Sequence, residues 1–106
     1  MFYIGVDIGT TSTKAVLFSK DSSVVKTHHV EYPLYSPTPL TAEQNPDDIF
    51  QAVLKSISGV MEESKIEPGQ VSLVSFSSAM HSVIAVDQEG HPLTQCITWA
   101  DSRSKK

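Results

Sequence analysis

Apolar residues near the start of the chain form two short runs that a polar loop separates. Residues 2–7 are apolar on both faces of a strand, as in a central strand, and residues 14–20 form a second run. About six residues separate the runs, too few for a crossover helix, so we expect an antiparallel hairpin. After a polar turn, residues 23–32 predict a third and more exposed strand.

A helix follows, and its beginning is clearly marked. Residues 33–44 contain three prolines and predict an ordered surface loop. Asn45 is a good N-cap and Pro46 suits the first helical position. Asp47 and Asp48 complement the positive end of the helix dipole. Seven apolar residues at helical spacing predict the face that packs on the sheet: Ile49, Phe50, Val53, Leu54, Ile57, Val60 and Met61.

The last third of the chain predicts more strands. Residues 71–77 predict a buried strand, and residues 82–87 and 93–99 predict a second hairpin around a turn at 88–91. Three strands, a helix, a strand and a hairpin predict an α/β architecture, a mixed sheet with a packed helix. No closing element for the sheet's other face follows residue 99, so we expect an incomplete domain.

Composition narrows the classes of partner. A chain of 106 residues suits one modest domain. Eight basic and twelve acidic residues give a formal net charge of −4, which argues against nucleic acid as a partner. There is no long apolar run or cationic leader, so we expect no membrane contact. The single cysteine, Cys96, cannot form an internal disulfide and fits a reducing cytoplasm.

The loop between the first two strands has the sequence Gly-Thr-Thr-Ser-Thr-Lys and could hold phosphate. Gly9 allows close backbone approach and positive φ, and Lys14 adds a positive charge. The backbone amides and hydroxyls of three residues are donors for phosphate oxygens: Thr10, Thr11 and Ser12. The loop is not a Walker P-loop, which has a second glycine before the lysine and a helix after it. A polar hairpin turn has the same composition.

Asp7 ends the first strand, directly before this loop. A carboxylate on a buried strand costs free energy unless it has partners. A hydrated Mg²⁺ between Asp7 and a nucleotide phosphate would be such a partner. Alternatively, Asp7 caps the amides of its own turn.

A second polar cluster follows the predicted strand at 71–77. Ser77, Ser78 and His81 could hydrogen-bond a polyhydroxylated substrate at the end of a strand, where α/β sheets bind ligands. Met80 could pack against the carbon skeleton of that substrate. The alternatives are a structural histidine, serines that form the turn, and a methionine in the core.

A third cluster lies near residue 100. Trp99, Asp101 and Arg103 could line a sugar site by stacking and hydrogen bonding. Equally, Asp101 caps a helix that begins at Ser102, while Trp99 packs in the core.

Four other polar residues receive no catalytic role. His28 and His29 lie on a predicted edge strand. Glu43 and Gln44 precede the helix cap and are expected to be structural, with contact to the substrate as the alternative.

Taken in order, four segments resemble carbohydrate kinases of the FGGY family. They are residues 6–19, 42–50, 75–87 and 92–103, so the resemblance covers nearly the whole chain. The run Ala-Met-His-Ser at 79–82, with Ile-Thr-Trp-Ala-Asp-Ser-Arg at 97–103, is most similar to the gluconate kinases of that family. Xylulose kinases usually carry Gln-Met-His-Gly there, and glycerol kinases an Arg-Glu pair that this chain lacks.

The resemblance implies an RNase H-like fold, shared with actin and the heat-shock ATPases. It implies transfer of the γ-phosphoryl group of ATP to a primary hydroxyl of gluconate, with Asp7 helping to hold Mg²⁺ through water. Met80 and His81 would contact the sugar acid. Four residues would face the transferred phosphate: Gly9, Thr10, Thr11 and Lys14.

The resemblance also implies that much of the kinase lies elsewhere. Family members are several times longer, and their general base and most of the adenosine pocket lie downstream. We therefore expect residues 1–106 to be the N-terminal part of the first domain and to be inactive alone. The alternatives are another sugar such as xylulose, an actin-like nucleotide-binding module without sugar chemistry, and an interaction domain whose sheet a partner or a homodimer covers.

Overall fold

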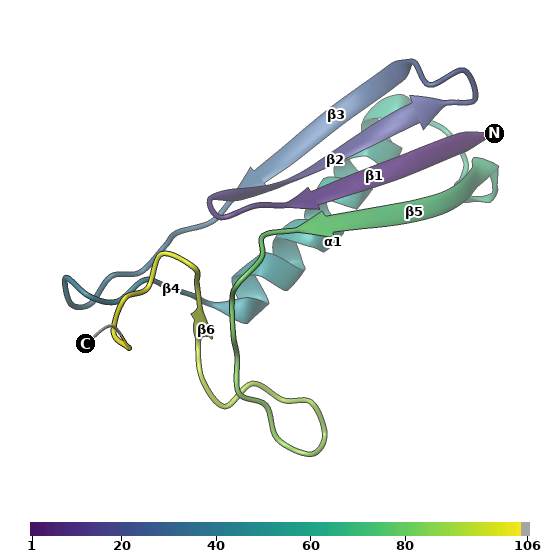
Figure 1. Ribbon diagram of the computed structural model, residues 1–106. Helices are drawn as coiled ribbons and strands as arrows, with labels where there is room; N and C mark the ends of the chain where they lie inside the picture. Colours follow the sequence, from purple (N-terminus) through teal and green to yellow (C-terminus); the bar gives the residue numbers. More distant parts are fainter. Residues whose placement is uncertain (105–106) are drawn as a thin grey trace.

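Four strands and one helix form two layers in the computed structural model, which describes residues 1–104 (Figure 1). The sheet has the order β3-β2-β1-β5 and α1 lies across one of its faces. Strands β1 and β5 are parallel, whereas the other pairs are antiparallel. The predicted mixed sheet with a packed helix is confirmed. The elements of this unit are β1 (Phe2–Ile8), β2 (Ser12–Ser19), β3 (Val24–Glu31), α1 (Pro46–Ser64) and β5 (Val71–Ser78).

The first hairpin has a tighter loop than the pattern predicted. Strand β2 begins at Ser12 instead of residue 14, so only residues 9–11 join it to β1. The amide of Gly9 donates to the carbonyl of Ser12 at 2.8 Å and closes the turn. Pairing therefore continues to Ile8 opposite Thr13, which brings Asp7 directly opposite Lys14.

The core lies between α1 and the centre of the sheet. It is formed by buried side chains of β1, β2 and α1: Ile4, Val6, Ala15, Leu17 and Val60. The predicted helix start is confirmed, because the Asn45 side chain accepts a hydrogen bond from the Asp47 amide at 2.9 Å. The helix ends at Lys65, which has a left-handed φ of 62°. No helix described for residues 1–104 is long and apolar enough to cross a membrane.

The predicted apolar face of α1 is confirmed in part, because four of its seven residues lie in the core or pack against it: Val53, Ile57, Val60 and Met61. Ala52, Ser56 and Val60 are buried, whereas Phe50 is 60% exposed and Leu54 is 45% exposed. The prediction that Phe50 and Leu54 pack on the sheet is therefore wrong for the described chain. The apolar stripe of the helix is wider than the sheet surface that residues 1–104 provide.

Strand β5 is confirmed as a strand, but not as a buried one. Only Val71 is partly buried, and Leu73 and Phe76 are 51% and 58% exposed. Strand β5 lies at the edge of the sheet, with β1 as its neighbour among the described strands. An apolar sequence predicts a strand that suits burial, but burial also requires a covering layer.

The predicted second hairpin is confirmed as a turn with antiparallel pairing on both sides, but not as two continuous strands. Its turn forms around Gly90, at a φ of 85°, where a carboxylate oxygen of Asp87 accepts hydrogen bonds from two backbone amides. The flanking segments pair only at separate positions and project as a long loop away from the four-stranded sheet (Figure 1). The end of the second predicted strand pairs on both sides, because Ile97 of β6 (Cys96–Ile97) lies antiparallel to Val83 and also to Glu43 of β4 (Glu43–Gln44).

Candidate active site

The carbonyl groups of the loop between β1 and β2 are held by two side chains from other parts of the chain. The Tyr32 hydroxyl donates to the carbonyl of Gly9 at 2.5 Å, and the Gln44 side-chain amide donates to the carbonyl of Thr10. The backbone amide of Tyr32 donates to the carbonyl of Thr11 at 3.0 Å. All three loop carbonyls thus point towards donors of the chain.

Two amides of the same loop, those of Thr10 and Thr11, make no hydrogen bond within residues 1–104. In a trans peptide, the carbonyl of one residue and the amide of the next point in opposite directions. The amides of Thr10 and Thr11 therefore point away from Tyr32 and Gln44, and neither has an acceptor within residues 1–104. Successive free amides of this kind form a concave site for an anion such as phosphate.

Gly9 is favoured by the limited space in the turn and not by an unusual backbone angle. Its φ is not positive, so that expectation is wrong; among the described glycines only Gly90 has a positive φ. A Cβ atom at Gly9 would lie 3.1 Å from the carbonyl oxygen of Ser12. A side chain there would therefore crowd the turn, and the close approach of this backbone to phosphate stays a prediction.

Asp7 and Lys14 face each other across β1 and β2, beside the loop. Strand alternation places both on the sheet face opposite α1, and both are exposed. With Ser77 of β5, they line a shallow hollow on that face. Asp7 is therefore not buried as expected, and it caps no turn amide, because its side chain makes no hydrogen bond within residues 1–104.

The chemistry of Asp7 suits a hydrated magnesium ion. Mg²⁺ prefers oxygen ligands, keeps several waters and often uses only one or two carboxylates beside phosphate oxygens. Asp7 offers one unpaired carboxylate next to an anion-binding loop. In the part of the chain that the structure describes, no three His, Cys, Asp or Glu side chains gather as a metal cage.

The second cluster is exposed at the end of β5. Ser78 is the last residue of the strand, and the amide of Ala79 continues the pairing by donating to the carbonyl of Ile8 at 2.9 Å. Met80 is 69% exposed, so its alternative place in the core is wrong. His81 is also exposed and has a positive φ of 64°, which is uncommon for a residue other than glycine.

Trp99 lies at the surface, and its side chain reaches the loop. The ring is 58% exposed, so the alternative in which Trp99 packs in the core is wrong. Its Nε1 donates to the Thr10 hydroxyl at 2.9 Å. The indole therefore connects the third cluster to the anion-binding loop.

Asp101 is held by Arg103 and by the backbone of residue 42. Its carboxylate accepts from the Ala42 amide at 2.7 Å and from the guanidinium of Arg103, which also contacts Glu43. These bonds, the one from Arg103 first, hold the pKa of Asp101 well below its usual range. The same carboxylate accepts from the Arg103 amide at 3.0 Å, as a helix cap would, and the course of a helix from Ser102 lies outside the described residues.

Comparison with known proteins decides the family of this chain. Residues 2–106 match the model for the N-terminal domain of the FGGY family of carbohydrate kinases. The chain belongs to this family. This chain is 56% identical over 104 residues to a gluconokinase of Bacillus licheniformis, and the match covers 98% of this chain and 20% of that protein.

Solved structures support the same assignment. A gluconate kinase from Lactobacillus acidophilus matches the FGGY domain with a TM-score of 0.87 and 39% identity, over 94% of this chain and 20% of that chain. A xylulose kinase from the same organism matches with the same TM-score, identity and coverage. The predicted RNase H-like, actin-like ATPase fold is confirmed. The chain spans about a fifth of the length of these relatives.

Some of the predicted site residues lie in two hollows. Asp7 and Lys14 line one of them, and His81, Trp99 and Asp101 line the other. The remaining predicted residues line neither: Gly9, Thr10, Thr11, Ser12, Ser78 and Met80.

Sequence reasoning missed the two side chains that hold the loop. No local pattern singles out Tyr32, which follows an ordinary strand. Gln44 lies in one of the segments that resembles the family, but we expected it to be structural. Their contacts with residues 9–11 join segments far apart in the sequence.

Proposed function

We propose that this chain is the N-terminal part of a kinase that transfers the γ-phosphoryl group of ATP to a primary hydroxyl of gluconate. The observation that carries the proposal is the pair of free amides at Thr10 and Thr11, next to the unpaired carboxylate of Asp7. A phosphate with a hydrated cation needs this combination. The identity to a gluconokinase supports gluconate as the acceptor.

The loop would act on the transferred phosphate. The amides of Thr10 and Thr11 and the hydroxyl of Ser12 would donate to its oxygens, and Lys14 would balance part of its charge. Asp7 would hold Mg²⁺ through water, and the ion, when bound, neutralises charge on the phosphates. Because these groups are held before the substrate binds, they need little reorganisation in the transition state.

The second hollow would bind the sugar acid. The exposed ring of Trp99 offers a flat apolar surface for the carbon skeleton, and His81 offers a hydrogen-bonding ring. Met80 and Ser78 would complete the contacts at the end of β5. The carboxylate of Asp101 is occupied by Arg103 and Ala42, so its contact with the substrate is the least direct of these predictions.

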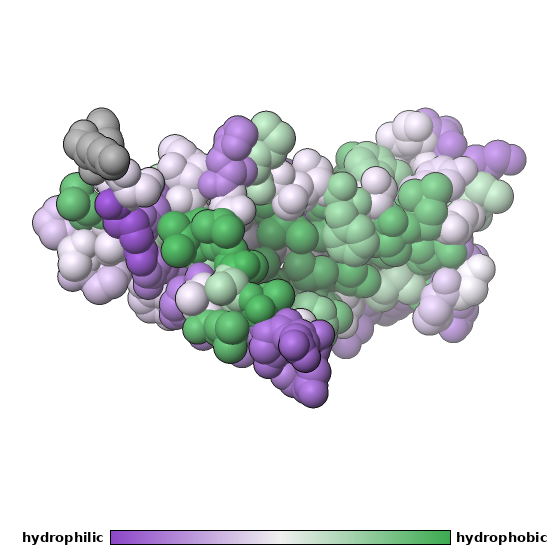
Figure 2. Space-filling view, turned by 60° about the horizontal axis from the view of Figure 1, so that its bottom comes forward, coloured by the Kyte–Doolittle hydropathy of each residue, from purple (hydrophilic) through white to green (hydrophobic). Residues whose placement is uncertain are grey.

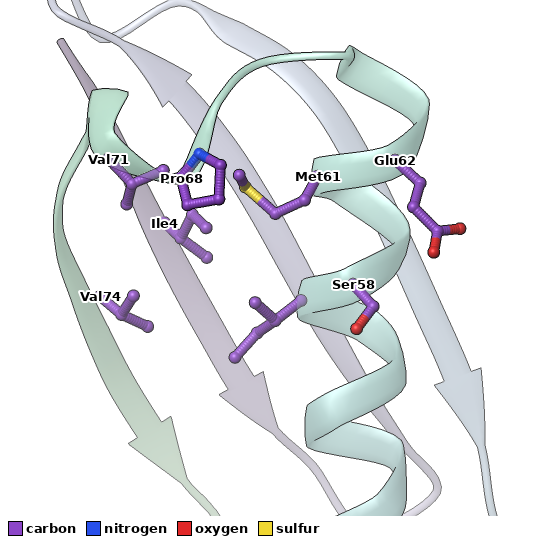
Figure 3. A pocket seen from close by; sticks show the side chains of 8 residues that line it. Ile4, Ser58, Met61, Glu62, Pro68, Val71 and Val74 are labelled. Atoms are coloured by element: carbon purple, nitrogen blue, oxygen red, sulfur yellow. The ribbon is translucent and has the colours of Figure 1, made fainter.

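An exposed apolar surface supports the proposal that this chain is part of a longer kinase. The side chains of Met61, Pro68, Val71 and Val74 gather around a groove between α1 and β5 (Figure 3). Figure 2 shows hydrophobic side chains gathered in a band on one face of the molecule. We propose that further parts of a two-domain kinase cover this groove and supply the general base and most of the adenosine pocket. The cytoplasmic location and a homodimer remain predictions.

Xylulose is the second candidate substrate. It is favoured by one observation, the equal match to structures of a gluconate kinase and of a xylulose kinase. An actin-like nucleotide-binding module is favoured less, because such a module has no use for the hollow beside Trp99.

The direct test is ADP formation by the full-length protein that carries this domain, with ATP, Mg²⁺ and either gluconate or xylulose. We expect kcat/KM for gluconate to exceed that for xylulose by at least about tenfold, the size that one or two lost hydrogen bonds produce. A preference for xylulose would reassign the substrate. ADP formation that no sugar accelerates would favour the nucleotide-binding module.

A further inference from the structure

We propose that Tyr32 and Gln44 are positioning residues, which hold the carbonyls of the loop at residues 9–11 so that its amides face the transferred phosphate. The inference rests on the proposed function, because it assumes that this loop binds phosphate. Neither side chain needs to touch ATP or the sugar. Each would act through the orientation of one peptide group.

Tyr32 is placed firmly enough for this role. It is only 7% exposed, and its hydroxyl lies 2.5 Å from the carbonyl of Gly9 and 3.1 Å from the hydroxyl of Thr13, which is fully buried. Burial raises the pKa of Tyr32, so the hydroxyl keeps its proton and remains a donor. Its backbone amide holds the carbonyl of Thr11 as well.

Gln44 holds the next peptide. It is 5% exposed, and its side-chain amide donates to the carbonyl of Thr10. Its backbone pairs with Cys96 of β6, and the N-cap of α1 follows directly. A buried amide that is fixed on both sides of its backbone can hold the loop with little loss of side-chain freedom on binding.

The two contacts prevent an alternative in which the loop would repel phosphate. Rotation of the peptide between Gly9 and Thr10 would turn the carbonyl towards the ligand and the amide away from it. A carbonyl oxygen beside a phosphate oxygen is repulsive, because both carry negative charge. The bond from Tyr32 favours the orientation that binds phosphate, and the bond from Gln44 does the same for the peptide between Thr10 and Thr11.

The first experiment substitutes Tyr32→Phe in the full-length kinase, with Tyr35→Phe as its matched control. Tyr35 is 43% exposed, and its hydroxyl makes no hydrogen bond within residues 1–104. Tyr32→Phe should lower kcat by about tenfold, less than the loss of a direct oxyanion donor. The KM for gluconate should stay within about twofold, because that ligand binds in the other hollow.

The second substitution is Gln44→Met, which keeps the length of the side chain and removes its donor. Gln51→Met is the control, because Gln51 is exposed on α1 and its side chain makes no hydrogen bond with the described residues. Gln44→Met should lower kcat to a similar extent as Tyr32→Phe. The two effects should not add fully in the double variant, since both act on one loop.

The decisive readout is the ratio of the dissociation constants of ADP and ATP. Only ATP carries the phosphate that the loop would hold. Each variant should therefore raise the dissociation constant of ATP by about fivefold or more and leave that of ADP unchanged. A residue with a merely structural role would lower Tm and leave this ratio unchanged. A ratio equal to that of Tyr35→Phe and Gln51→Met would overturn the inference, whatever happens to kcat.

The same measurements separate this inference from the proposed function. ATP and ADP binding needs no sugar turnover, so the ratio judges the role of Tyr32 and Gln44 even if gluconate is not the substrate. Failure of gluconate to stimulate ADP formation overturns the proposed substrate. A wild-type protein that binds ATP no tighter than ADP overturns the inference.

Discussion

The indole Nε1 of Trp99 lies 2.9 Å from the hydroxyl of Thr10, to which it donates a hydrogen bond. Trp99 lines the hollow proposed for the sugar acid, and Thr10 lies in the loop proposed for phosphate. The hydrogen bond therefore connects the hollow proposed for the sugar acid to the loop proposed for phosphate, between residues 89 positions apart in the chain.

Trp99→Phe and Thr10→Val should show that the sugar hollow and the phosphate loop are energetically coupled. Each variant removes the hydrogen bond: Val has the shape of Thr without its hydroxyl, and Phe keeps an aromatic ring without the indole N–H. In the full-length kinase, we expect each variant to lower kcat/KM for gluconate. The loss of transition-state stabilisation in the double variant should be smaller than the sum of the two single losses by about 1 kcal/mol, the typical net contribution of a hydrogen bond. Strictly additive losses would show that the hydrogen bond does not couple the sugar hollow to the phosphate loop.

Asp7→Asn should abolish most of the activity without unfolding the protein. The amide cannot replace a carboxylate that helps to hold Mg²⁺, so we expect kcat of the full-length kinase to fall by at least about 100-fold. Tm should hardly change, because Asp7 is exposed and its side chain makes no hydrogen bond within residues 1–104. Asp47→Asn, at an exposed position on α1, is the control and should retain activity. An unchanged kcat in Asp7→Asn would remove Asp7 from the mechanism.

Gly59→Ala should destabilise the packing of α1 on β3. A Cβ atom there would lie 2.4 Å from the ring of His28, so the ring would have to move and lose its contact with Glu63. We expect a loss of about 1–3 kcal/mol in the free energy of unfolding, the range for overpacked sites. Gly69→Ala is the matched control, because no atom lies within 4 Å of the added Cβ. Equal stability of the two variants in denaturant titrations would contradict this packing.

Glu63 should make stability depend on pH in the acid range. The hydrogen bond from His28 is the main cause that lowers the pKa of Glu63 from its ordinary value of 4.5, and Lys26 adds to it. A lowered folded-state pKa stabilises the protein above the unfolded-state value, and this stabilisation is lost as the pH falls through the folded-state value. Glu63→Gln should therefore be less stable than wild type near pH 6, and the difference should shrink as the pH falls below 4.5 and through the lowered pKa of Glu63. Glu62→Gln, which removes a neighbouring exposed carboxylate, should leave the pH dependence of Tm unchanged.

The chain of 106 residues alone should not phosphorylate gluconate. Under the proposed function, the general base and most of the adenosine pocket lie in the remainder of a kinase about five times longer. We expect no gluconate-dependent ADP formation above the rate of buffer in a coupled assay. Sustained turnover by these residues would show that the fragment carries its own base.

The sequence predicted correctly those helices and strands that depend on residues close together in the chain. The start of α1 follows from the Asn45 cap and from Pro46, and the first hairpin follows from two apolar runs with a short polar loop. The same reasoning was only partly right at 82–99, where the turn around Gly90 forms but the segments beside it pair only at separate positions. The end of the second segment also pairs with β4, and a pairing with so distant a segment is not visible in a local pattern.

By itself, the sequence determined the mixed α/β fold, the family and the glycine-threonine loop, because each depends on residue types at short spacing. Only the tertiary structure decided which way the peptides of that loop point. Their orientation depends on Tyr32 and Gln44, which reach the loop from positions 23 and 34 residues away. The structure also decided that Phe50 and Phe76 are exposed, because burial depends on the neighbours that cover a side chain and not on its own hydrophobicity.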